Sequence, residues 1–63
     1  MSVTPELSSL STSLAELAVR VGALAEELTA GAREDLAADL YEVERSLEAA
    51  RRRLGKVVDG LTR

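Results

Sequence analysis

Large apolar residues recur along the whole chain with alternating spacings of three and four. In the first half they are Leu7, Leu10, Leu14, Leu17, Val21, Leu24 and Leu28. In the second half they are Leu36, Leu40, Val43, Leu47, Ala50, Leu54, Val57 and Leu61. An average period of 3.5 residues held this long is typical of a coiled coil. No segment alternates with a period of two, so the pattern predicts helices and no strands.

Local chemistry at the ends of the two tracts predicts where each helix begins and ends. Thr4 followed by Pro5 is typical of an N-cap and a first-turn proline. Gly31 can take the left-handed backbone conformation that ends many helices. We therefore expect one domain consisting of a helix over about 5–29, a loop over about 30–33 and a helix over about 34–60.

The two tracts mirror each other about the expected loop. Leu24 pairs with Leu40 and Leu17 with Leu47, and in every such pair the two residue numbers sum to 64. This symmetry predicts an antiparallel helical hairpin, in which facing residues form the seam. The residues expected to hold the hairpin together are Leu10, Leu14, Leu17, Val21, Leu24, Leu40, Val43, Leu47 and Leu54.

A second set of helical positions in the first tract holds only small residues. We call this set the small-residue face; it consists of Ser8, Ser11, Ala15, Ala18, Gly22, Ala25 and Thr29. Small side chains let another helix approach closely, and a lone hairpin with the leucine seam would leave this face in water. The hypothesis is a partner interface at Ala15, Ala18, Val19, Gly22 and Ala25. The alternative is that alanine is simply a good helix former.

The short chain favours association with a second subunit. A domain of 63 residues buries too little surface to be very stable alone, and it usually needs a disulfide, a metal or a partner. The chain has no Cys and no His, so a partner is the remaining choice. We expect a homodimer in which two hairpins form a four-helix bundle. A helical segment of another protein is the alternative partner.

Charges are distributed unevenly along the second tract. Residues 34–48 are mostly acidic, and residues 49–63 are mostly basic. The basic residues Arg51, Arg52, Arg53 and Lys56 are candidates for contact with an anionic partner. Consecutive arginines spread around a helix and no aromatic residue lies near them to stack on a base, which argues against nucleic-acid binding. The alternative is a solvated helix surface with ordinary ion pairs.

Several classes of function are disfavoured by composition. Without His, Cys or a Gly-rich phosphate loop, the Ser-rich stretch 8–13 has no base to activate it, so we expect no enzyme, no cofactor and no metal site. The net charge of −3 further disfavours nucleic acid. No apolar run reaches membrane-spanning length and no signal peptide is visible, so we expect a cytoplasmic protein without a membrane partner. The richness in Ala, Leu, Arg and Glu is typical of GC-rich bacterial genomes.

Three functional hypotheses follow from these patterns. The first is a non-catalytic helical hairpin that self-associates and acts as a small adaptor or regulatory subunit. The second is a regulator that binds an anionic nucleotide or nucleic acid through residues 51–53. The third is an accessory subunit of a larger enzyme, docked through the first helix.

Overall fold

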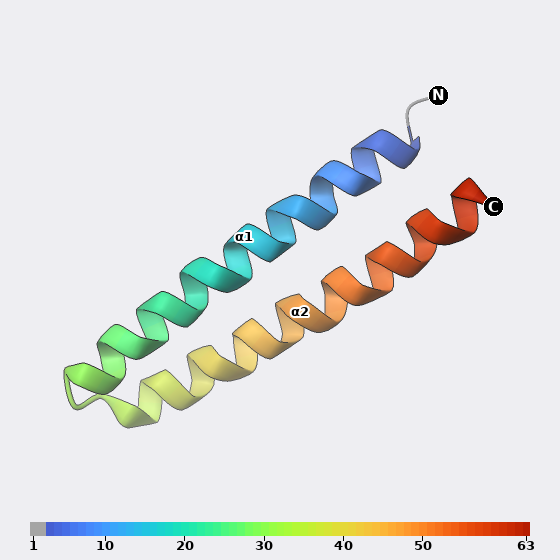
Figure 1. The fold of residues 1–63 in the computed structure, drawn as a ribbon. Coiled ribbons are helices and arrows are strands. Elements are labelled where there is room, and N and C mark those ends of the chain that lie inside the picture. The colour runs from blue at the N-terminus through green and yellow to red at the C-terminus, as the bar shows by residue number, and fades with distance from the viewer. Residues whose placement is uncertain (1–2) are drawn as a thin grey trace.

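The chain is a single antiparallel helical hairpin. A computed structural model describes residues 3–63, with α1 over Val3–Ala30 and α2 over Glu34–Thr62. Three residues, 31–33, join the helices, so the start of α1 at Val3 and the end of α2 at Thr62 lie at the opposite end of the molecule from this turn (Figure 1). The all-α hairpin that the heptad pattern predicts is confirmed.

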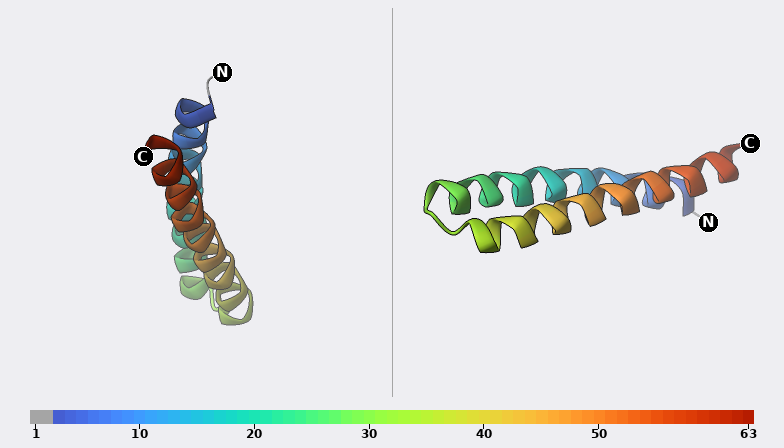
Figure 2. Two further views of the ribbon diagram at one scale, coloured as in Figure 1. Left: turned by 90° about the vertical axis from the view of Figure 1, so that its right-hand side faces the viewer. Right: turned by 90° about the horizontal axis from the view of Figure 1, so that it is seen from below.

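The two helices lie side by side over their whole length. The three views of the ribbon agree that α2 follows α1 from the turn to the open end, crossing it at a shallow angle (Figures 1 and 2). The hairpin measures 48 × 14 × 12 Å, which is one layer of two helices. With no third element in this layer, each helix can bury side chains only against the other.

The turn ends α1 with a Schellman motif. The Arg33 N–H donates to the Leu28 carbonyl at 2.8 Å, and the Ala32 N–H donates to the Thr29 carbonyl at 3.1 Å. The residue with left-handed backbone is Ala32, at φ 62°, and no described glycine has positive φ. The expectation that Gly31 adopts this conformation is therefore wrong, because Gly31, the first residue after α1, still donates its N–H to the Glu27 carbonyl as a helical residue would.

The helix starts also differ from expectation. α1 includes Val3 and Thr4, so Thr4 is a helical residue rather than the N-cap, and Pro5 lies in the first turn. Proline is tolerated there because first-turn N–H groups have no partner within the helix. α2 begins at Glu34 as expected, but its N-cap residue Arg33 makes no side-chain capping hydrogen bond.

The core of the hairpin is made only of alanine. The buried apolar residues are Ala18, Ala25 and Ala37, and no large side chain among residues 3–63 is fully buried. A buried alanine contributes much less hydrophobic stabilisation than a buried leucine, because the contribution scales with apolar area. The hairpin therefore has helix-to-helix contact along its length but no core of large side chains.

Candidate protein interface

The small-residue face of α1 lies against α2. Ala25 is 0% exposed and Ala18 is 2% exposed, and Ser11, Ala15 and Gly22 are half-buried. In a two-helix molecule only the other helix can cover Ala18 and Ala25 to this extent. The expectation that a lone hairpin leaves this face in water is therefore wrong. Of the five expected partner-interface residues, the structure places Ala18, Gly22 and Ala25 along the contact between the two helices.

Gly22 illustrates how tightly the small-residue face accommodates α2. A Cβ added at Gly22 would overlap the carboxylate of Glu44, with the Glu44 Cδ only 3.1 Å away. A glycine inside a helix costs about 1 kcal/mol relative to alanine. The group that lies beside Gly22 is the end of the flexible Glu44 side chain of the same hairpin, not the backbone of another helix that the small residues were expected to admit.

The leucines of α1 divide into an inward row and an outward row. Leu7, Leu14, Val21 and Leu28 are half-buried beside α2, whereas Leu10, Leu17 and Leu24 are 43% to 54% exposed. On α2, Leu40, Leu47 and Leu54 are half-buried, but Leu36, Val43 and Val57 are exposed. The prediction that Leu10, Leu17, Leu24 and Val43 hold the hairpin together is therefore wrong.

Both outward rows lie on the same face of the hairpin. In α1 each outward residue follows an inward residue by three positions, as Leu17 follows Leu14. In α2 the sense is the same, as Val43 follows Leu40. Antiparallel helices are related by an approximate two-fold axis perpendicular to their common plane, and this axis leaves each face on its own side. We call the resulting surface the apolar face; it consists of Leu10, Leu17, Leu24, Leu36, Val43 and Val57.

The rotation of the helices has a physical reason. If both rows of leucines met in one seam, the small residues of α1 would have to be exposed and their close-packing capacity unused. Turning each helix about its axis places Ala18 and Ala25 against α2, where small side chains permit close contact. The outward rows then form a separate apolar surface beside the contact between α1 and α2.

Val19 lies on the opposite side of the hairpin from the apolar face. Its side chain is 71% exposed. Together with Ala15, Glu16 and Arg20 it lines a shallow hollow on the outer surface of α1. Val19 is thus the one residue of the expected partner interface that is fully accessible, and it stands apart from the outward leucines.

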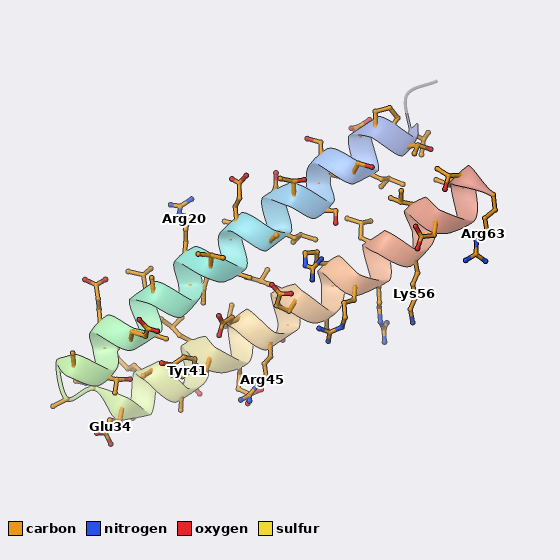
Figure 3. All side chains as sticks on the ribbon, in the orientation of Figure 1. Arg20, Glu34, Tyr41, Arg45, Lys56 and Arg63 are labelled. Atoms are coloured by element: carbon orange, nitrogen blue, oxygen red, sulfur yellow. The ribbon has the colours of Figure 1, made fainter. Side chains whose placement is uncertain are left out.

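The basic residues near the end of α2 do not converge on one site. The Arg51 guanidinium donates to the Glu48 carboxylate at 3.1 Å, and both side chains are half-buried. Arg52, Arg53 and Lys56 are exposed. Figure 3 shows Lys56 directed away from α1, and Arg63 at the end of the chain. The cations of this segment therefore spread around the helix, as the spacing of consecutive residues predicts.

Other kinds of site are not found in the part of the chain that the structure describes. Neither α1 nor α2 combines the length and apolarity needed to cross a membrane. Residues 3–63 contain no group of three or more acidic side chains placed to hold a metal ion. No known protein family, curated protein or solved structure matches the chain.

Proposed function

We propose that the protein is a non-catalytic interaction module in which two hairpins associate through their apolar faces into a four-helix bundle, and that it serves as a small adaptor or regulatory subunit. The observation that carries the proposal is the apolar face itself. Six large aliphatic side chains remain 41% to 54% exposed in two rows along the hairpin, while nothing larger than alanine is buried between Val3 and Arg63. Large exposed apolar surfaces of this kind mark interaction sites.

A second copy of the chain fits this face well. Leu17 lies midway between Leu10 and Leu24 on α1, seven residues from each. A two-fold axis near Leu17 therefore sets Leu17 against its counterpart and Leu10 against Leu24 of the partner subunit. Such an isologous contact uses one patch twice and closes after two subunits. It would also supply the core of large side chains that a single hairpin lacks.

The test replaces Leu17 with glutamate and uses Val19→Glu as the matched control. Both are exposed apolar residues of the same helix, two positions apart, on opposite faces of the hairpin. Each buried leucine contributes about 1.5–3 kcal/mol, and the substitution acts twice in a symmetric dimer. We expect Leu17→Glu to raise the dissociation constant at least about 100-fold, measured by sedimentation equilibrium. Val19→Glu should leave it unchanged.

A second measurement needs no substitution. If the folded hairpin is stabilised by its partner, the melting temperature of the unmodified protein rises with protein concentration. Circular dichroism at several concentrations measures this directly. A melting temperature independent of concentration, or a Val19→Glu variant that dissociates while Leu17→Glu does not, would contradict the proposal.

A further inference from the structure

We infer that the two hairpins pack in opposite directions, so that the turn of one lies against the open end of the other. This inference rests on the proposed self-association and specifies its geometry. Two symmetric arrangements can bring the apolar faces together. In one, the turns lie at the same end and α1 packs on α2 of the partner subunit. In the other, the turns lie at opposite ends, and each helix packs on its own counterpart.

The charge of the hairpin differs between its two ends. Around the turn, residues 24–42 carry six carboxylates against one arginine. At the open end, residues 3–10 and 51–63 carry five cationic side chains against two carboxylates. Figure 3 shows this separation in space, with Glu34 beside the turn and Lys56 and Arg63 near the open end. Packing in opposite directions places acid on base at both ends, whereas packing in the same direction places like charges together.

Along the edge of the apolar face on α2, single residues are likewise acidic toward the turn and basic toward the open end. Asp39, Ser46 and Arg53 follow Leu36, Val43 and Ala50 by three positions each, on the side away from α1. Asp39 is seven residues before Ser46, and Arg53 is seven residues after it. A two-fold axis near Ser46 therefore brings Asp39 of each subunit to the partner's Arg53. Both side chains are exposed, and the ion pairs found within residues 3–63 involve neither of them.

One axis can serve both helices. α1 ends at Ala30 and α2 begins at Glu34, so positions level with each other across the hairpin have numbers that sum to about 64. Leu17 is then level with position 47, which is one residue, or about 1.5 Å along the helix, from Ser46. The midpoint of the leucine row on α1 and the midpoint of the charged row on α2 thus lie within one helical turn. A single two-fold axis at this level therefore satisfies both rows in the same dimer.

In the other arrangement the charges conflict. With the turns at the same end, the edge residues of α1 face those of α2 in the partner subunit at the same level. Glu27 is level with position 37, about 3 Å along the helix from Asp39, so these two carboxylates would lie close together at both copies of the contact. Like charges placed together oppose association and act against the wrong orientation.

Distance measurement between spin labels tests the orientation. The chain has no Cys, so one substitution gives one labelled site per subunit. Ala30 is exposed beside the turn. In the labelled Ala30→Cys dimer we expect a distance of about 39 Å along the helices, because Ala30 is 13 residues from the axis near Leu17 and the axis doubles this distance. Ser46→Cys, near the proposed axis, should give a distance less than half as long.

The outcomes separate the orientation from the association. A dimeric mass with an Ala30→Cys distance below half the hairpin length would overturn the orientation and leave the association intact. A mass of 6.7 kDa without dipolar coupling would overturn both.

A charge-reversal cycle provides an independent test of the Asp39–Arg53 contact. Within one helix these residues are 14 positions and about 21 Å apart, so they cannot interact directly in one chain. We expect Asp39→Arg and Arg53→Asp each to weaken dimerisation roughly three- to tenfold. The double reversal should restore the original affinity. Additive losses in the double variant would overturn the contact.

Discussion

At the scale of single residues, the turn shows that the residue with left-handed backbone can lie one position away from the glycine that predicts it. The sequence places its only loop glycine at 31, yet the left-handed residue of the Schellman motif is Ala32. A left-handed conformation costs an L-residue roughly 1–2 kcal/mol, and glycine avoids this cost. The glycine signal therefore located the turn correctly, but hydrogen bonds to the last carbonyl groups of α1 determine which residue reverses the chain.

Exchanging the two residues tests this assignment without changing composition. In the double variant Gly31→Ala/Ala32→Gly, the helical position gains an alanine and the left-handed position gains a glycine. A Cβ at position 31 would lie 3.4 Å from the Glu27 carbonyl oxygen, which is ordinary contact. We expect stabilisation of about 1 kcal/mol, measured by denaturant unfolding. Destabilisation would show that Gly31 is the left-handed residue instead.

At the scale of the helices, the heptad pattern predicts where the helices lie and how they pair, but not how each is rotated about its own axis. Period and mirror symmetry predicted two helices, their antiparallel pairing and nearly all of their extent. They could not determine the rotation of each helix about its own axis, because adjacent heptad rows are both regular. Leu17 and Ala18 are neighbours that recur with the same period. The choice of the inward row depends on how closely the two backbones can approach.

One signal could have indicated the rotation beforehand. Ser11, Ala18 and Ala25 are spaced by seven and lie beside the leucine rows, which is the pattern of a close helix–helix contact within one molecule. The pattern alone favours a partner for this row, because the largest apolar residues are expected to fill the hairpin seam. The apolar face, which is the main candidate interface, was missed for the same reason.

Enlarging the buried alanine row tests the rotation. Ala25→Leu would place a large side chain where the exposed fraction is 0%, and overpacking of this kind costs about 1–3 kcal/mol. Ala23→Leu is the control, because Ala23 is exposed on the same helix. Alanine and leucine have similar helix propensities, so this exchange alone should change stability little. We expect thermal unfolding to show a lower melting temperature for Ala25→Leu only. Equal effects of the two substitutions would contradict the buried position of Ala25.

At the scale of the whole molecule, the hairpin combines a close internal contact with an exposed apolar surface. Its internal contact uses alanine and glycine, which fix geometry but bury little area. Its large aliphatic residues face outward on one side, and acidic and basic groups occupy opposite ends. These features together favour a partner that covers the face along its full length, and a second hairpin in reverse orientation matches them in shape and charge.

The measurement that tests the central proposal most directly is the mass of the unmodified protein in solution by light scattering, over a range of concentrations. Because Tyr41 is the only aromatic residue, concentration is best followed by refractive index. The account predicts twice the 6.7 kDa chain mass, decreasing toward a single chain only on dilution. A constant mass of 6.7 kDa with helicity unchanged across the series would show that the hairpin is stable with its apolar face in water, and would contradict self-association.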